Sequence, residues 1–502
     1  MVTGVTVHGN IDTSVVYSVA DCRTPVERRR SLYPAGPMTG GLPIPVASKG
    51  SVPGMAPGAS WPPPVPGSPA ARDLFAIAAR KDPLGDRVHF WMAVVTMAVQ
   101  PVHPIPAAIG QAVVIVYALL RIHATWRGAL PLLRSPLVVV SILIPLWTGI
   151  AIAWSSAPEV GFEDILPLRF PLFALCLWPL RDRAWPLLLA LASGCAVQAV
   201  AQASMFVGLV PNLNEPYDAW EQTGGLGKHP GNTALFAAVT LPILLGRALV
   251  VETRRGMSAV LFLAGASSVV FAGNRTHFLV VPVALVMAVL RVVVTRRFLR
   301  ARWRSMLAAG IGGVLMLAAV PLVAPDSLVV NRVNAMIREV ERAVVDGEYE
   351  SSSGLRLYWW RESVGVMGES PIFGHGTGST RPAMQAYLAG IRGPAEAARF
   401  ATDNPHSTLV SEGIERGAIG ILLWGGLAVL GLIGARRVSN IEPWLTGLPA
   451  AWLILIGYGL SSSVQLSGIN TAVLAILLFL TLPPPIPPPL RPEGPSGTDP
   501  GT

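Results

Sequence analysis

Two arginines and two tryptophans between residues 353 and 361 form a group suited to binding phosphate. Arg356 and Arg361 lie on either side of Trp359 and Trp360, and Arg356 and Trp360 are one turn apart if the segment is helical. A planar guanidinium group can bind two phosphate oxygens at once, a geometry that lysine does not offer. The alternative is an arginine that packs on an indole ring through a cation–π contact. The segment is therefore a candidate phosphate site.

Arg275 is a second candidate for binding phosphate. It stands between Asn274 and Thr276, at the end of a tight hairpin that joins two apolar runs. An arginine at a membrane boundary can also simply extend its charge into the interface, which is the alternative interpretation. The polar neighbours and the tightness of the hairpin favour a functional role.

His406 is the candidate base. It lies between Pro405 and Ser407-Thr408, a pair that favours the start of a helix, where the chain returns to an apolar run. A neutral imidazole near pH 7 can accept a proton from an attacking hydroxyl group. The alternative is a histidine that only makes structural hydrogen bonds.

The glycine-rich segment 374–378 contains another histidine, His375. The segment lacks the lysine and the strand–loop–helix setting of a phosphate-binding loop, so a tight turn after Pro371 is the interpretation that it favours. His375, and His229 with its neighbour Lys228, are weaker candidates for contacts to a substrate. No spacing of His, Cys, Asp or Glu predicts a metal site.

Long apolar runs make up most of the remaining chain and must position these residues. Of the 502 residues, 52% are hydrophobic and only 13% are charged. Apolar runs near the roughly 20 residues needed to cross a bilayer predict an all-α polytopic membrane protein with about twelve transmembrane helices. The expected helices lie near 88–103, 105–121, 135–153, 164–180, 184–208, 232–250, 257–273, 276–294, 305–323, 417–434, 441–461 and 466–482.

The distribution of charge predicts the orientation of the chain. The formal net charge of +9 comes mostly from arginines in the N-terminal tail and in short loops between apolar runs. This is the positive-inside distribution, so we expect both termini in the cytoplasm and no nucleic-acid partner. The loops at 154–163, 209–231 and 324–416 then lie on the opposite side.

The chain is expected to divide into membrane helices, one large loop and two tails. No apolar segment follows the start, so no signal peptide is expected. Apolar residues from Val333 to Val344 recur at helical spacing, which predicts a helix lying on the outer leaflet. The expected parts are a disordered Pro/Gly-rich cytoplasmic tail (1–86), helices one to nine (87–323), an extracytoplasmic catalytic loop (324–416), helices ten to twelve (417–482) and a disordered Pro-rich tail (483–502).

Together these residues resemble the O-antigen ligase and O-antigen polymerase family of bacterial membrane glycosyltransferases. The chain has His406-Ser407 where that family shows a His-Asn pair, and Asn274-Arg275 where the family often shows Ser-Arg. The segments that carry the resemblance are Arg356…Trp360, Pro371-x-x-Gly374-x-Gly376, His406 followed by Glu415-x-Gly417-x-x-Gly420, Asn274-Arg275, and Gly227-Lys-His-Pro230-Gly-Asn232.

The resemblance implies transfer of a glycan from an undecaprenyl diphosphate carrier to an acceptor hydroxyl. The acceptor would be a lipid A–core sugar or another carrier-linked glycan, and the enzyme would lie in the bacterial inner membrane with its active loop on the periplasmic face. Arg275 and Arg356 would neutralise the charge that develops on the diphosphate, and His406 would take the proton, with inversion at the anomeric carbon. No metal or cofactor is implied. The residues expected to bind substrate are Arg361, Lys228, His229, Trp360 and His375.

Two other classes of protein fit the sequence less well. A transporter or flippase for lipid-linked or anionic substrates would show two related repeats with broken helices and charges near mid-bilayer. No repeat is detected, and the polar residues gather in one outer loop. A receptor or sensor would need a signalling module, which the sequence lacks. Ligase, polymerase and protein-glycan ligase activities stay open.

Overall fold

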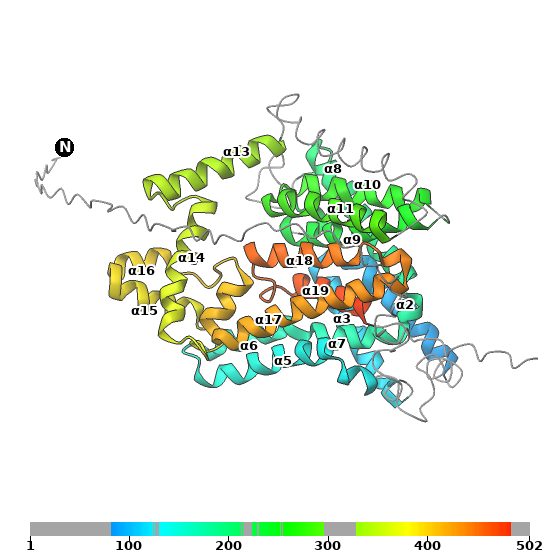
Figure 1. Cartoon of the computed structure of the whole chain (residues 1–502), viewed down its shortest axis with the longest axis horizontal. Helices are drawn as coiled ribbons and strands as arrows, with labels where there is room; N and C mark the ends of the chain where they lie inside the picture. Colours follow the sequence, from blue (N-terminus) through cyan, green and yellow to red (C-terminus); the bar gives the residue numbers. More distant parts are fainter. Residues whose placement is uncertain are drawn as a thin grey trace, which may run out of the picture. The chain divides into compact units, whose positions relative to one another are not determined.

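A computed structural model describes residues 82–482, with gaps at 124, 126–129, 212, 214–222, 228–229, 252, 254 and 296–327. All described residues belong to one compact unit. Within them every regular element is a helix and no strand occurs, as the sequence predicts for its fold class (Figure 1).

The described helices before residue 328 form the first part of the membrane region. Proline opens many of them, because its fixed φ suits the first turn and its missing N–H has no partner there anyway. The tight turn between the first two follows from Pro101 and Pro104. The helices are α2 (Pro83–Val99), α3 (Pro104–Leu120), α5 (Pro136–Ala151), α6 (Pro158–Ile165), α7 (Phe170–Leu177), α8 (Ala184–Phe206), α9 (Pro230–Val250), α10 (Arg255–Phe271) and α11 (Arg275–Thr295).

Three further helices complete the membrane region: α17 (Thr408–Ile441), α18 (Leu448–Ser461) and α19 (Gly468–Thr481). Helix α9 lies at the centre of the packing, against α10, α11 and α18, and 78% of its most apolar window is buried. Helix α17 packs between α5 and α18 (Figure 1). The main hydrophobic core is formed by buried side chains of these helices.

Six of the described segments are long and apolar enough to cross a membrane. The helices expected at 164–180 and 184–208 both lie within one apolar helical stretch, Pro158–Phe206, in which a short 3-10 segment, Trp178–Arg183, joins α7 and α8. The helix expected at 305–323 lies outside the described residues. The six spans are Pro136–Trp154, Pro158–Phe206, Pro230–Val250, Arg275–Val294, Thr408–Ile441 and Pro443–Ser461, and the shorter apolar helices are Pro104–Leu120, Arg255–Phe271 and Gly468–Thr481.

The polar segment before α17 folds into four helices: α13 (Leu328–Glu341), α14 (Ser352–Glu369), α15 (Thr380–Arg392) and α16 (Pro394–Phe400). Helix α13 covers most of the stretch where a helix was expected, and a π-helical turn extends it to Gly347. Helix α14 packs against α13, α15 and the start of α17 (Figure 1). Two small hydrophobic clusters, separate from the main core, hold these helices together. Helix α14 therefore connects the outer helices to the membrane region.

Candidate active site

One face of α14 carries two of the predicted site residues, Arg356 and Trp360. Ser351 caps the helix by accepting a hydrogen bond from the backbone N–H of Gly354 at 3.1 Å. Because Ser353, Arg356 and Trp360 follow at intervals of three and four residues, they share a face, called here the inner face of α14. The eight residues from Ser353 to Trp360 span roughly 10 Å along the helix axis, so the two ends of this face are well separated.

Arg275 meets the first turn of this inner face. Gly273, with φ of 60°, makes the sharp turn between α10 and α11, and Asn274 caps α11 by accepting the N–H of Thr276 at 3.0 Å. Arg275 donates a hydrogen bond of 3.1 Å to the hydroxyl of Ser353. The tight hairpin predicted from the sequence thus presents Arg275 to α14.

The guanidinium group of Arg275 also holds a carboxylate. It donates two hydrogen bonds, of 2.7 and 2.9 Å, to the two oxygens of Glu339 on α13. Burial alone would raise the pKa of Glu339, but the hydrogen bonds from Arg275 and Ser353 outweigh it and lower the pKa to about 2. Glu339 therefore stays ionised and accepts hydrogen bonds from both terminal nitrogens of Arg275, the two donors that a phosphate would use.

Arg356 is charged, half-buried and unpaired. Within the part of the chain that the structure describes, no hydrogen bond or ion pair reaches its guanidinium group. Burial lowers its pKa, and the positive charge of nearby Arg275 lowers it further. Taking a charge out of water is costly unless a counter-charge compensates it. Two neighbouring guanidinium groups, of which only one has a carboxylate, form a site that favours an anion.

The other end of the inner face meets His406. The rings of His406 and Trp359 are stacked, with centroids 5.8 Å apart and planes 24° apart. The indole N–H of Trp360 donates a 2.9 Å hydrogen bond to the carbonyl oxygen of Pro405, directly before the histidine. Arg275, Arg356 and His406 are thus all joined to one helix, α14.

The backbone of His406 is in a strained conformation. Among the described residues it is the one residue other than glycine with positive φ, at 54°. Such conformations cost about 1–3 kcal/mol and persist only when the surroundings hold them. The side-chain oxygen of Asn404 accepts the N–H of His406 at 2.9 Å and also the hydroxyl of Ser463 at 2.8 Å. Asn404 therefore ties His406 to the loop between α18 and α19.

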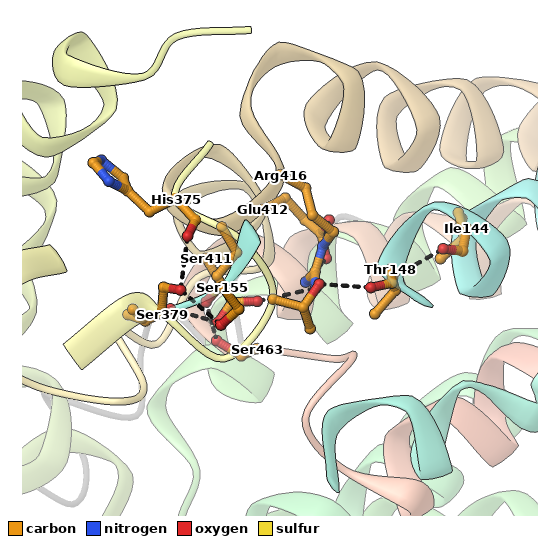
Figure 2. A network of polar contacts seen from close by, with 12 residues as sticks. Ile144, Thr148, Ser155, His375, Ser379, Ser411, Glu412, Arg416 and Ser463 are labelled. Carbon is orange, nitrogen blue, oxygen red and sulfur yellow. Dashed lines mark hydrogen bonds and ion pairs between the residues drawn. The ribbon is translucent and has the colours of Figure 1, made fainter. Parts of the chain in front are cut away.

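Figure 2 shows a buried polar network that includes Ser411, Glu412, Arg416 and Ser463. The hydroxyl groups of Ser463 and Ser411 are 3.1 Å apart, which links Asn404 to the first turn of α17. One turn on, Arg416 donates two hydrogen bonds, of 2.6 and 2.7 Å, to Glu412, and both side chains are buried. Glu415, also buried, lies 3.0 Å from the same guanidinium group, so Arg416 joins two carboxylates in this part of α17.

The two glycine motifs of the sequence bind each other. The N–H groups of His375 and Gly376 donate 2.8 Å hydrogen bonds to the carbonyl oxygens of Ile414 and Glu415. A Cβ atom on Gly374 would lie 2.4 Å from the backbone of Glu415, so only glycine allows the approach. The tight turn predicted after Pro371 is confirmed, and it packs against the break in α17 at Gly417, where the backbone is non-helical.

Two predicted substrate-binding residues lie away from the inner face. The ring of His375 makes a 3.0 Å hydrogen bond with the carbonyl oxygen of Val366 in α14. Arg361 is five residues beyond Arg356, about 140° around the helix, and is engaged by Glu362 and by the hydroxyl of Tyr349 at 2.7 Å. The structure therefore brings Arg275, Arg356, Trp360 and His406 together along α14, without His375 or Arg361.

Lys228 and His229 lie outside the described residues, but Asn232, in the same motif, can be placed. Its side-chain oxygen accepts the hydroxyl of Tyr458 at 3.2 Å, and Tyr458 lies close enough to Arg356 to interact with its charge. The motif therefore reaches the neighbourhood of the inner face through Tyr458.

Sequence reasoning missed several residues that position the site. Asn404 carried a signal, since asparagine two residues before another backbone N–H often accepts it in a turn. Ser353 could have been found from its spacing to Arg356. Nothing in the sequence marked Glu339 or Tyr458, because their roles depend on contacts with distant segments. No group of three or more His, Cys, Asp or Glu side chains positioned to hold a metal occurs among the described residues.

Residues 258–425 match the family model described as "O-Antigen ligase". The matched segment contains Arg275, Arg356 and His406, with the two glycine motifs. A comparison of the chain with curated proteins finds no match.

Proposed function

Because residues 258–425 form a domain of the O-antigen ligase family, an enzyme family, we propose that the chain is a membrane glycosyltransferase. It transfers a glycan from an undecaprenyl diphosphate carrier to an acceptor hydroxyl group. The observation that carries the proposal is the half-buried guanidinium group of Arg356, which lies beside Arg275 and has no partner among the described residues. Two adjacent guanidinium groups in a partly desolvated site match the charge and the planar hydrogen-bonding geometry of a diphosphate.

In the proposed reaction the diphosphate binds across Arg275 and Arg356. Since Glu339 already accepts hydrogen bonds from both terminal nitrogens of Arg275, the diphosphate competes with this carboxylate. The acceptor oxygen attacks the anomeric carbon, and the bond from that carbon to the phosphate oxygen breaks. The electron pair leaves with the diphosphate, where the two arginines stabilise the added charge.

His406 takes the proton of the acceptor hydroxyl in this proposal. Its position favours this role, because the Trp359 ring and the Asn404 side chain hold it at the opposite end of the inner face from Arg275. Attack from the side opposite the leaving diphosphate inverts the configuration of the anomeric carbon. Arginines supply the positive charge, so the proposed reaction uses no metal and no cofactor.

The proposed topology places this reaction outside the cytoplasm of a bacterium. The chain crosses the inner membrane about twelve times, and residues 324–416 form the catalytic loop on the periplasmic face. The six candidate spans and three shorter apolar helices among the described residues support part of this count. The tails at 1–86 and 483–502 belong to the cytoplasmic side in this arrangement.

Deleting the gene and separating the surface glycans by size tests the proposal and decides the acceptor. Loss of all polymer from lipid A–core indicates a ligase, whereas a single attached repeat unit indicates a polymerase. Loss of glycan from a protein acceptor alone indicates a protein-glycan ligase. The proposed function would be contradicted if the deletion left glycans of every class unchanged in a strain whose parent expresses the protein.

A further inference from the structure

A pocket lies on the face of α14 opposite the inner face, called here the outer face. It has a volume of about 540 Å³ and lies between α14, α16 and the segment Gly347–Glu350. The volume falls within the range of pockets that enclose small-molecule ligands. Tyr358 and Arg361 of α14 line it, and neither belongs to the inner face that carries Arg356. The proposed transfer reaction assigns no task to this pocket.

Aromatic rings form one wall of the pocket. Tyr358 is buried at 1% exposure, and it contacts the rings of Tyr349 and Phe400, with centroids 5.3 and 4.7 Å away. Tyr349 and Phe400 are only half-buried and line the pocket. Such rings offer a large apolar surface beside polar groups, and the C–H faces of sugar rings stack on surfaces of this kind.

The charged groups of the pocket do not favour a phosphate. Three carboxylates line it, from Glu348, Glu350 and Glu396, against two guanidinium groups, from Arg361 and Arg392. Both arginines already have carboxylate partners: Arg361 donates to Glu362 at 2.5 Å, and Arg392 donates to the same oxygen at 3.2 Å. Carboxylates accept hydrogen bonds and guanidinium groups donate them, so the lining matches the hydroxyl groups of an uncharged or amino-substituted sugar.

A short segment connects the pocket to the candidate base. The carbonyl oxygen of Phe400, whose ring lines the pocket, accepts a 2.8 Å hydrogen bond from the indole of Trp359, and that indole stacks on His406. The chain then runs from Phe400 to His406 in six residues. A glycan in the pocket would therefore lie near the position where the acceptor hydroxyl loses its proton.

We propose that the outer-face pocket of α14 binds sugar residues of a glycan, separately from the diphosphate at Arg275 and Arg356. The inference rests on the proposed transfer reaction and extends it with a second subsite. The glycan is either the acceptor or the part of the donor glycan beyond its first sugar, since both present the same hydroxyl-rich chemistry. Tyr349 is the residue to change, because its ring is half-buried and its hydroxyl accepts a hydrogen bond from Arg361 at 2.7 Å.

The test uses the full-length protein in detergent and two separate probes. The first is the glycan released by mild acid from the lipid-linked glycan of cells that lack the gene, followed by saturation-transfer NMR. The second is undecaprenyl diphosphate without a glycan, followed by quenching of tryptophan fluorescence. We expect Tyr349→Ala to weaken glycan binding at least tenfold and to leave the binding of undecaprenyl diphosphate unchanged. Arg356→Ala is expected to have the opposite pattern.

Two further variants test whether a loss of glycan binding comes from misfolding or from a nonspecific effect of substitution. Tyr349→Phe keeps the ring and is expected to keep most of the glycan binding, which separates stacking from loss of folding. Arg381→Ala, at an exposed arginine on α15 that pairs with Asp403, is the matched control and should bind both probes normally. Equal glycan binding by wild type and Tyr349→Ala, with both proteins folded, would overturn the proposal.

Kinetics of transfer in proteoliposomes then identify the source of the glycan. A raised KM for the acceptor in Tyr349→Ala assigns the pocket to the acceptor, and a raised KM for the lipid-linked donor assigns it to the donor. If wild type binds glycan in the pocket but transfers none, the proposed function fails while the pocket stands. If wild type transfers glycan and Tyr349→Ala changes neither KM, the pocket proposal fails while the function stands.

Discussion

The two faces of α14 carry arginines five residues apart in opposite environments. On the inner face, Arg356 is half-buried and has no hydrogen-bond or ion-pair partner within the described residues. On the outer face, Arg361 is about half-exposed, at 48%, and its guanidinium group is engaged by Glu362 and Tyr349. Identical side chains on the same helix therefore differ in both solvation and pairing.

The difference shows which arginine is prepared for an anion. A guanidinium group that already has a carboxylate gains little from a second anion, whereas a desolvated and unpaired one gains the full interaction. Arg275 is expected to gain an intermediate amount from binding a diphosphate, because the diphosphate would have to displace the carboxylate of Glu339. The inner face thus suits the charged part of the substrate, and the outer face suits its hydroxyl groups.

His406→Ala is expected to have the largest effect on transfer. Loss of a general base typically lowers the rate by about 10²–10⁴-fold, and His406 is the proton acceptor in the proposed reaction. Turnover in proteoliposomes measures it, with insertion and thermal unfolding as controls for folding. Full activity in a folded His406→Ala protein would remove this residue from the proton-transfer role.

Arg356→Ala and Arg361→Ala form the direct test of the two faces. Removing one group that stabilises developing negative charge typically costs about 10²–10³-fold in turnover, and we expect that loss for Arg356→Ala. Arg361→Ala is expected to change turnover less than about tenfold, because its charge is already neutralised by Glu362. Equal losses of turnover in the two variants would break the distinction between the faces.

Trp359→Leu is expected to have a smaller effect, of about tenfold on turnover. The substitution removes the ring that stacks on His406 and the hydrogen bond to Phe400, so the imidazole is less well positioned. Trp359→Phe keeps an aromatic ring for stacking and should recover part of the activity. If Leu and Phe variants behave alike, the stacking contact does not position His406.

Glu339→Gln is expected to affect stability, with little effect on turnover. The pKa of Glu339 is about 2 in the folded protein against an ordinary value of 4.5. Its stabilising contribution is therefore fully present above about pH 4.5 and is lost as the pH falls towards 2. The unfolding temperature of the variant should be lower than that of wild type at pH 6, and the gap should close in acid.

Glu341→Gln on the same helix provides the control for that measurement. Glu341 is exposed and makes no ion pair with any described residue, so its substitution should leave the unfolding temperature unchanged at both pH values. A gap for Glu339→Gln that is independent of pH would show that the ion pair with Arg275 is not its source.

The sequence by itself determined which residues are candidates for catalysis and where most of the helices lie. Apolar runs of membrane-spanning length predicted the helices, since backbone groups in a bilayer must be satisfied within each segment. The expected helix after 330 and the tight turn after Pro371 are both present, because helical periodicity and glycine conformation are local properties. The same local reasoning selected Arg275, Arg356 and His406 as the groups to bring together.

Only the tertiary structure decided which of the selected residues share a site. The five-residue spacing sets Arg356 and Arg361 on different faces of a helix, but packing decides which face meets Arg275 and which meets Tyr349. The roles of Glu339, Asn404 and Tyr458 likewise depend on contacts between segments far apart in the chain. Burial and pairing, which set the free energy of a charge, arise from such contacts and therefore leave no mark in the local sequence.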